Sequence, residues 1–382
     1  MTTITISDLY IYPIKSTKGL RLPHASVDEL GLAFDRRFVV SDDSGQFITA
    51  RTEPTLCLVS ATISDLGIIL TAPNMPELLL EYQKFSNQYK NVNVWGDDIA
   101  GQLCSIEASS WFSEYLHRPC KLLYFGKESS RVKKPNTESA RKVAFADGYP
   151  LLLISQTSLD DLNQRLISNN EKPVSMAQFR PNIVVENCLP FAEDGWQYIR
   201  IGDIDFKVSK PCVRCIFTTV NPENGDKSPQ QQPLTTLKTY RQTDQGEVLF
   251  GQNLIPLNSG QIAQGDNITI IKTKQTPVFK KSTAKLADTK VSKKKKVAIQ
   301  FETWQKNYSA DNQQTILEHG EAAGLIIPSS CRAGMCGRCK AKLISGEVTQ
   351  LVDDGLSEEE KQQGYILCCS SIAQSDVVVK HR

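Results

Sequence analysis

The spacing of four cysteines near the C-terminus constrains this chain more than any other feature. The segment SSCRAGMCGRC places Cys331, Cys336 and Cys339 in a C-x4-C-x2-C pattern, and Cys369 follows after 29 intervening residues. This is the ligand spacing of one class of [2Fe–2S] site, in which three thiolates come from a tight loop and the fourth from a distant segment. The sequence therefore predicts an iron–sulfur cluster on these four residues.

Two other interpretations of the cysteines have to be weighed. Structural zinc also takes four thiolates, but it prefers paired CxxC-like ligands, whereas three cysteines here come from one loop. The other interpretation is that the cysteines are plain buried core residues, yet Gly334 and Gly337 lie among them. Glycines permit unusual backbone angles and let amides approach the cluster sulfurs closely, which favours the iron–sulfur interpretation.

Length and total cysteine content set the broad class. A chain of 382 residues is expected to form two or three domains. It has 11 cysteines, and its start, MTTITISDLY, does not resemble a secretory signal, so metal or redox chemistry is favoured over disulfides. No apolar run approaches the roughly 18 residues of a membrane span. We expect a cytoplasmic protein without membrane association.

Positive charge is concentrated in one short segment. Residues 272–296 contain ten lysines and one acid, Asp288, while the formal charge of the whole chain is only +2. The remainder is therefore mildly acidic, and we expect no stable nucleic-acid binding by a folded face. A contact of the lysine run with RNA or a membrane is an alternative, but a solvated, self-repelling linker is favoured.

The remaining chain reads as two folded parts on either side of this run. Residues 3–271 contain many short apolar strands separated by turn signals, which indicates a β-rich, barrel-like body with a few covering helices. Within it we expect a helix over 158–167, capped by Ser158, and a strand at IFTTV, residues 216–220. Strands and short helices return from Val297 onward.

A second group of residues also points to chemistry. FRPNI (179–183) and KPCVRCIFTT (210–219) place arginines and cysteines at the starts of apolar strands. Guanidinium groups suit a phosphate-bearing ligand, and a thiolate suits a soft metal. Each signal is weak alone, because a single CxxC is also compatible with a redox dithiol, half of a metal site or two core cysteines.

Several motifs together resemble a known family. YPIKS, DRRF, TAR, ADGYPLLLIS, FRPNI and PCVRCIFTTVNPENG occur in the order found in MOSC-domain proteins, which bind the molybdenum cofactor and include the mitochondrial amidoxime-reducing components. From about Val297 to Lys380 the chain resembles plant-type ferredoxins. The complete order resembles the bacterial YcbX type.

This resemblance implies an α+β, β-rich fold in which a MOSC β-barrel body is joined by a flexible basic linker to a β-grasp ferredoxin domain. The expected domains are a MOSC N-terminal β-barrel domain at 1–105, a MOSC domain at 106–272, a Lys-rich flexible linker at 273–296 and a [2Fe–2S] ferredoxin domain at 297–382.

The resemblance also implies roles for individual residues. Cys215, the second cysteine of PCVRC, matches the catalytic, molybdenum-ligating thiolate, whereas Cys212 does not match a metal ligand. In the register of the ferredoxins, Cys369 rather than the adjacent Cys368 is the fourth cluster ligand. The positions that match residues holding the molybdenum cofactor are Lys15, Ser16, Arg36, Gly148, Tyr149, Arg180, Asn182 and Arg214.

The implied activity is a molybdenum-dependent reduction of small N-hydroxylated compounds, such as N-hydroxylaminopurine-type bases, to amines. Electrons would pass from an NADPH-dependent flavoprotein reductase through the [2Fe–2S] domain to molybdenum. Two alternatives stay open: a sulfur carrier that uses a persulfide on Cys215, and a non-catalytic electron carrier.

Overall fold

The computed structural model describes residues 3–133, 140–280, 295–329, 332, 334, 337–353 and 355–381. The contacts between residues divide the chain into two compact units. The larger unit comprises Met1–Cys212, Phe217–Pro233 and Phe250–Pro277, and the smaller unit comprises Val213–Ile216, Leu234–Leu249 and Val278–Arg382.

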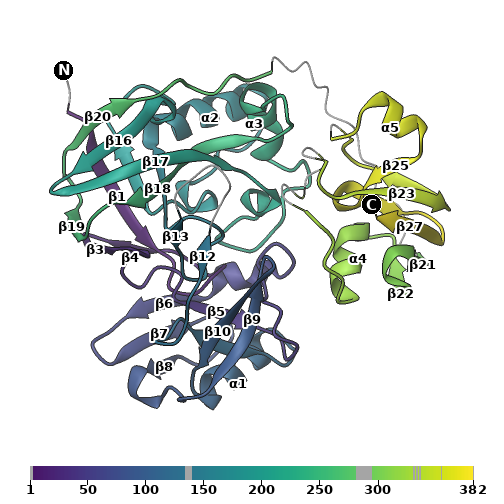
Figure 1. Cartoon of the computed structure of the whole chain (residues 1–382), viewed down its shortest axis with the longest axis horizontal. Helices are drawn as coiled ribbons and strands as arrows, with labels where there is room; N and C mark the ends of the chain where they lie inside the picture. Colours follow the sequence, from purple (N-terminus) through teal and green to yellow (C-terminus); the bar gives the residue numbers. More distant parts are fainter. Residues whose placement is uncertain are drawn as a thin grey trace. The chain divides into compact units, whose positions relative to one another are not determined.

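A curled eight-stranded sheet dominates the larger unit (Figure 1). Its strand order is β2 (Leu20–Leu22), β1 (Thr5–Ile11), β15 (Ile183–Glu186), β14 (Leu151–Ser155), β18 (Leu249–Pro256), β17 (Ile204–Val213), β16 (Trp196–Ile201) and β20 (Ile268–Thr273). Apolar side chains from β1, β14, β15, β16 and β17 bury one another in a common core. This arrangement confirms the predicted β-rich body.

Smaller sheets complete this unit. A four-stranded sheet and a three-stranded sheet enclose a second core together with helix α1. The strand order of the four-stranded sheet is β5 (Phe38–Ser41), β11 (Lys121–Tyr124), β10 (Asp97–Leu103) and β9 (Tyr89–Val94). The strand order of the three-stranded sheet is β6 (Ser60–Ile63), β7 (Gly67–Thr71) and β8 (Leu78–Glu81). The other small sheets are formed by β19 (Gly260–Ala263), β3 (His24–Asp28) and β4 (Gly31–Leu32), and by β12 (Val132–Lys133) and β13 (Arg141–Lys142).

Topology brings distant loops to one edge of the eight-stranded sheet. Strand β1 is antiparallel to β15, with Leu9 opposite Ile183, and β15 is parallel to β14, with Leu153 opposite Ile183. The end of β1 therefore lies beside the starts of β14 and β15. YPIKS follows β1, ADGYP precedes β14 and FRPN precedes β15, so the fold collects three of the sequence motifs at this edge.

Two local expectations are wrong. The helix expected over 158–167 is α2 (Gln156–Ser168), and its N-cap is Ser155, whose hydroxyl accepts from the Ser158 amide. Since Ser158 is itself buried inside the first turn, the helix begins earlier than its apolar spacing indicates. IFTTV is not a strand: Ile216–Thr219 forms a 3-10 turn, because the Val220 amide bonds to the Phe217 carbonyl and closes the backbone locally.

The other two helices outside the C-terminal region are short. Helix α1 (Ile106–Tyr115) begins after Ser105, whose hydroxyl accepts from the Ala108 amide. Helix α3 (Leu234–Arg241) belongs to the smaller unit.

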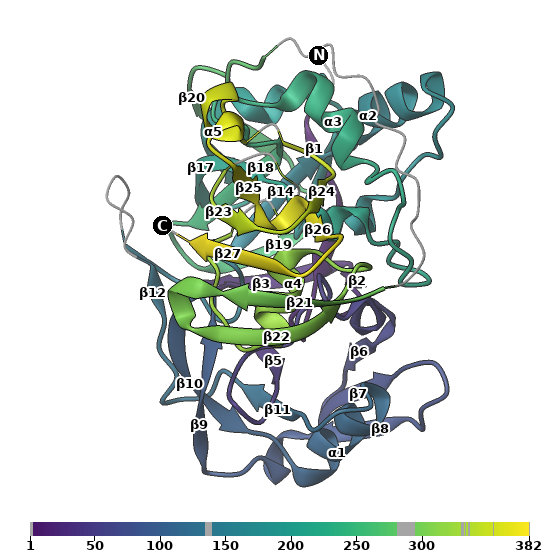
Figure 2. The ribbon, with the colours of Figure 1, turned by 90° about the vertical axis from the view of Figure 1, so that its right-hand side faces the viewer.

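The C-terminal region builds a five-stranded mixed sheet, seen in Figure 2. Its order is β22 (Lys306–Asp311), β21 (Lys296–Phe301), β27 (Val377–His381), β23 (Lys340–Ser345) and β25 (Tyr365–Leu367), and a second pair joins β24 (Val348–Gln350) to β26 (Ser371–Ala373). Helix α4 (Ile316–Ala322) is capped by Thr315, and α5 (Glu358–Gln362) is capped by Ser357. Helix α4 packs its buried residues into the core of this domain.

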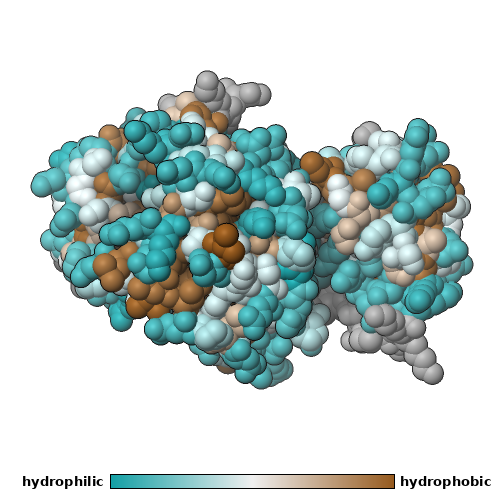
Figure 3. Space-filling model, turned by 90° about the horizontal axis from the view of Figure 1, so that it is seen from below, coloured by the Kyte–Doolittle hydropathy of each residue, from teal (hydrophilic) through white to brown (hydrophobic). Residues whose placement is uncertain are grey.

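Most of the expected linker, 273–296, lies outside the described residues, which omit 281–294. In the part of the chain that is described, no helix has the length and apolarity to cross a membrane. The face seen in Figure 3 is largely hydrophilic, with hydrophobic residues gathered in limited areas.

Candidate functional site

Lys15 is buried at the loop edge of the eight-stranded sheet. Its ammonium group donates to the Phe145 carbonyl at 2.8 Å and to a carboxylate oxygen of Asp147. Its position is fixed by the backbone, because the Lys15 amide donates to the Phe38 carbonyl at the start of β5. The direction of this side chain is therefore set by the loop that follows β1.

Asp147 gathers further donors around its carboxylate. Arg51 binds Oδ2 at 2.9 Å, and the indole Nε1 of Trp95 donates to Oδ1 at 2.9 Å. The Arg51 guanidinium also lies 4.4 Å from the centre of the Trp95 ring. The cofactor-binding residues predicted from the sequence do not include Arg51, Trp95 or Asp147. Asp147 nevertheless directly precedes Gly148 in the ADGYP motif.

Arg36 and Arg180 form a second group around the buried ring of Tyr12. Their guanidinium carbons lie 4.4 and 4.1 Å from the ring centre. Arg36 donates to Asp35 at 2.6 Å and to the amide oxygen of Asn182 at 3.0 Å. Its other terminal nitrogen donates to the backbone carbonyl of Arg180 at 3.2 Å. DRRF and FRPN are thus connected directly.

Arg37 of DRRF and Asn182 of FRPN have different contacts. Arg37 turns away from this group and binds the carboxylate of Asp28 at 2.9 Å. Asn182 is fully buried and accepts from the Leu152 amide at 3.1 Å while donating to the Tyr10 carbonyl at 3.1 Å. Asn182 therefore ties β1, β14 and the Arg36 side chain together.

Backbone strain coincides with the predicted cofactor-binding residues. Ser16, Arg36 and Arg180 have φ angles of 75°, 47° and 57°, in the left-handed region. Each such residue costs about 1–2 kcal/mol relative to an ordinary conformation. Strain of this kind persists where surrounding structure imposes it, and it clusters at ligand-binding sites.

Burial alters the acid–base properties of the ion pair. Burial lowers the pKa of Lys15 to about 8, and the charge of Asp147 only partly opposes this. The pKa of Asp147 is held well below its usual range by Lys15 and Arg51, which outweigh the opposing effect of burial. The pKa of Arg180 is also lowered by burial.

The described side chains of this cluster fit an anionic group. Lys15 and Arg51 pair with Asp147, and Arg36 pairs with Asp35, while Arg180 packs on the Tyr12 ring. Four cations thus lie with two carboxylates, which leaves positive charge in excess. An excess of cations that are buried or half-buried is unfavourable unless an anion shares the site. The phosphate of a pterin cofactor is an anion of this kind.

Gly148 and Tyr149 are positioned next to Asp147 by another arginine. Arg141 donates to the Gly148 carbonyl at 2.6 Å, and its guanidinium carbon lies 3.7 Å from the centre of the Tyr149 ring. A Cβ added at Gly148 would meet no atom within 4 Å, so open space adjoins this residue.

Arg214 and Cys215 follow β17, in the segment Val213–Ile216 of the smaller unit. The Arg214 amide donates to the Val248 carbonyl at 2.8 Å, and its side chain is buried. Cys215 and Cys212 are both half-buried. A partly accessible thiol on a short connection after a strand suits a metal ligand, so the geometry of Cys215 is compatible with its predicted role.

The described part of the iron–sulfur site brings two cysteines together. The Sγ atoms of Cys339 and Cys369 lie 3.1 Å apart without forming a disulfide. The Gly334 amide donates to Cys369 Sγ at 3.3 Å, and the Cys369 amide donates to Cys339 Sγ at 3.4 Å. Adjacent thiols with amide donors suit two thiolates on one iron.

The cysteine loop requires its glycines. Gly334 and Gly337 have φ angles of +72° and +70°, and an added Cβ would lie 2.5 Å from the Val352 carbonyl and 2.7 Å from the Gly355 carbonyl, respectively. The loop therefore fits a cluster that needs close backbone approach. Cys331 and Cys336, the other two predicted ligands, lie outside the described residues.

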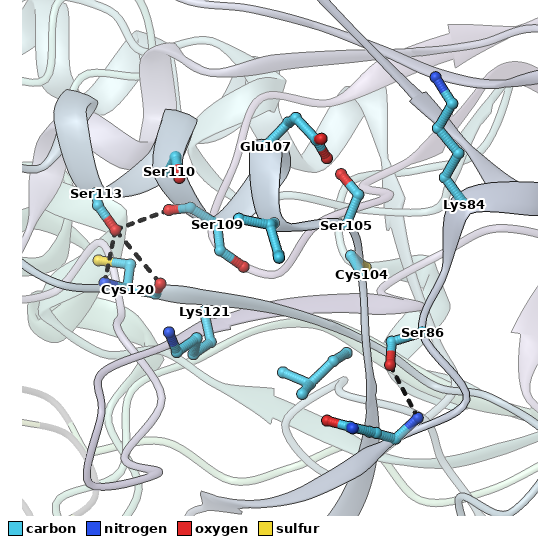
Figure 4. A pocket seen from close by; sticks show the side chains of 13 residues that line it. Lys84, Ser86, Cys104, Ser105, Glu107, Ser109, Ser110, Ser113, Cys120 and Lys121 are labelled. Atoms are coloured by element: carbon cyan, nitrogen blue, oxygen red, sulfur yellow. Dashed lines mark hydrogen bonds between the residues drawn. The ribbon is translucent and has the colours of Figure 1, made fainter.

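A separate cavity of about 650 Å³ lies beside α1, between Lys84 and Lys121 (Figure 4). Its serines bond mainly to local groups: Ser113 donates to the Ser109 carbonyl and accepts from the Cys120 amide. None of the predicted site residues lines it, so it plays no part in the site described above.

Known families match three successive parts of the chain. Residues 3–119 match the MOSC N-terminal beta barrel domain, residues 140–269 the MOSC domain, and residues 302–374 the 2Fe-2S iron-sulfur cluster binding domain. Mitochondrial amidoxime-reducing component 1 of Mus musculus is 37% identical over 284 residues, which cover 70% of this chain and 82% of that protein. The chain belongs to the amidoxime-reducing component family. Mitochondrial amidoxime reducing component 2 of Bos taurus is 40% identical over 253 residues, covering 64% and 74% of the two chains.

Among solved structures, pectocin M2 aligns with 22% of this chain and 32% of its own, at 35% identity and a TM-score of 0.21. The family assignment rests on the sequence relatives and the three domain matches. It confirms the predicted combination of a MOSC body with a C-terminal ferredoxin domain. The domain boundaries and the role of each site residue stay predictions.

Proposed function

We propose that this member of the amidoxime-reducing component family is a molybdenum-cofactor-dependent reductase of small N-hydroxylated compounds, with N-hydroxylaminopurine-type bases as the substrate class. The observation that carries the proposal is the cluster of Lys15, Arg36, Arg51 and Arg180, which are buried or half-buried and whose excess positive charge suits a phosphate-bearing cofactor. The names of the curated relatives supply the reaction class.

The reaction consumes two electrons and two protons: R–NHOH becomes R–NH2 and water, as the N–O bond breaks. The bound cofactor supplies a two-electron centre with soft sulfur ligands, to which Cys215 would contribute its thiolate. Lys15, Arg36 and Arg180 hold the phosphate. Ser16, Asn182, Arg214, Gly148 and Tyr149 complete the proposed cofactor-binding set.

The ferredoxin domain supplies the electrons in this proposal. A [2Fe–2S] cluster carries one electron at a time, so two transfers precede each N–O cleavage. The proposed donor to the cluster is an NADPH-dependent flavoprotein reductase, since a flavin converts a hydride into single electrons. The approach of Cys339 to Cys369 supports a cluster at this position.

A pair of cysteine variants tests the proposal. Protein from a host that makes the cofactor is assayed for reduction of an N-hydroxylated purine base with reduced methyl viologen. Cys215→Ala is expected to lose at least about 100-fold in rate while keeping its iron, because the metal loses its protein thiolate. Cys212→Ala, the matched control in the same CxxC, is expected to keep most of the activity.

Wild-type rates in Cys215→Ala would contradict the proposed role of the thiolate. A persulfide on Cys215 in wild-type protein that contains no molybdenum would instead favour sulfur transfer. Cluster reduction without any turnover of N-hydroxylated bases would favour a simple electron carrier.

A further inference from the structure

The chain does not leave the folded body at the end of β20. After Thr273, the Lys274 amide donates to the Gly195 carbonyl at 2.7 Å. Farther along, Phe279 contacts the last residue of α3 and Lys280 contacts the hairpin that follows this helix. The expected linker, 273–296, thus has a structured beginning.

Phe279 packs against a buried arginine. The guanidinium carbon of Arg241 lies 4.3 Å from the centre of the Phe279 ring. Arg241 is 3% exposed, and its Nε donates to the Leu249 carbonyl at 3.0 Å, so the cation is held in place beneath the ring. Phe279 is half-buried, whereas Val278 and Lys280 on either side are exposed. The aromatic ring is therefore the side chain that fixes this part of the chain.

A backbone hydrogen bond continues the contact. The Lys280 amide donates to the Gln242 carbonyl at 2.8 Å. Gln242 pairs with Val248 across a tight turn, and the Val248 carbonyl accepts from the Arg214 amide at 2.8 Å. A short series of backbone contacts thus connects Lys280 to the segment that contains Cys215.

We infer that Phe279 and Lys280 anchor the Lys-rich segment to the end of α3 and the hairpin Gln242–Val248, so that the connection to the ferredoxin domain begins beside the Cys215 segment. The inference rests on the proposed function, in which Cys215 holds the metal that receives the electrons. Phe279 is a positioning residue: it touches neither metal nor substrate.

The anchor shortens the connection that links the two redox centres. At the other end, the Lys295 amide donates to Asn312 Oδ1 at 2.7 Å, within the ferredoxin domain. The segment between the two fixed points is 281–294, 14 residues, which spans at most about 50 Å. Without the Phe279 anchor it would begin after Lys274 and contain 20 residues, 275–294.

The length of the connection sets how much loss of the anchor should slow electron transfer from the ferredoxin domain. Effective concentration falls roughly as the −3/2 power of linker length, so a change from 14 to 20 residues lowers it about 1.7-fold. Transfer from the ferredoxin domain should slow by this factor when the anchor is lost. Reduction by a small external donor should not change.

Amide hydrogen exchange on the full-length protein tests the anchor without any assay of turnover. The Lys280 amide is expected to be protected in wild type and to exchange at least about tenfold faster in Phe279→Ala. Val278→Ala is the matched control, because that neighbour is exposed and should leave the protection intact. Phe279→Tyr keeps an aromatic ring and should therefore keep the Lys280 amide protected. Fast exchange at Lys280 in wild type, or equal protection in Phe279→Ala, would overturn the inference.

A second measurement connects the anchor to electron delivery. Rates with an NADPH-dependent flavoprotein reductase are compared with rates in excess reduced methyl viologen, on one N-hydroxylated purine base. Phe279→Ala should slow the first about 1.7-fold and leave the second and the iron content unchanged. Equal rates of wild type and Phe279→Ala with the reductase would contradict the role of the anchor in electron delivery. If wild type turned over with neither donor, the proposed function would be refuted, and the hydrogen-exchange result alone would test the anchor.

Discussion

At the scale of single residues, the proposed cofactor site depends on partners that lie far away in the sequence. Lys15 meets Asp147, 132 positions along the chain, and Arg36 meets Asn182, 146 positions along. The motifs were sufficient to select Lys15, Arg36, Arg180 and Asn182 as candidates. They did not indicate that an aspartate and a tryptophan complete the group, because those contacts arise only when the strands pair.

The pKa of Lys15 gives a pH dependence with a definite sign. The ammonium form predominates below about pH 8 and is lost as the pH rises through that value, so the site should hold a phosphate anion less well in alkali. We predict that wild type loses cofactor affinity by up to about tenfold per pH unit above pH 8. Lys15→Arg, which stays charged, should lose much less.

Molybdenum retained per chain after gel filtration at pH 7.0 and pH 9.5 measures this difference. Lys15→Met is the uncharged control and should retain little metal at either pH. Equal retention by wild type at the two pH values would show that the charge of Lys15 does not hold the cofactor.

At the scale of elements, sequence patterns predicted regular features better than their ends. The strand-rich body expected at 3–271 and the helix expected over 158–167 are both present. The predicted start of α2 lies two residues after the observed start, because Ser155 and Ser158 are both plausible caps and only burial decides between them. Ile216–Thr219 is rich in β-branched residues, yet local hydrogen bonds override that preference.

The 3-10 turn Cys368–Ser370 separates the roles of two adjacent cysteines. All three cysteines lie in the domain core, but Cys369 Sγ lies 3.1 Å from Cys339 Sγ. Cys368 is only 1% exposed, and burial raises the pKa of its thiol. The Cys368 amide also donates to the Cys339 carbonyl at 3.0 Å, which fixes this orientation.

We therefore predict that Cys369→Ser loses the visible absorbance and the electron paramagnetic resonance signal of a [2Fe–2S] cluster, with iron per chain falling severalfold. Cys368→Ser is the matched control and should keep both signals, although a buried hydroxyl should lower domain stability by about 1–3 kcal/mol. Loss of the cluster in Cys368→Ser at an unchanged melting temperature would reverse the assignment.

At the scale of the whole molecule, the order of domains could be predicted because the motifs are local and occur in sequence. The ferredoxin ligands span only residues 331–369, so their spacing alone defines the domain. The composition of residues 272–296 indicated a linker, but composition did not reveal that Phe279 packs against Arg241. A contact between a single aromatic ring and a buried arginine leaves no periodic signal in a sequence.

The central claim is that one chain carries two redox centres, and elemental analysis tests it most directly. Molybdenum and iron are measured per chain in wild type and Cys215→Ala, purified from a host that supplies the cofactor. We predict about one molybdenum and two irons in wild type, with iron kept and molybdenum reduced in the variant. Two irons without molybdenum in both proteins would contradict the account.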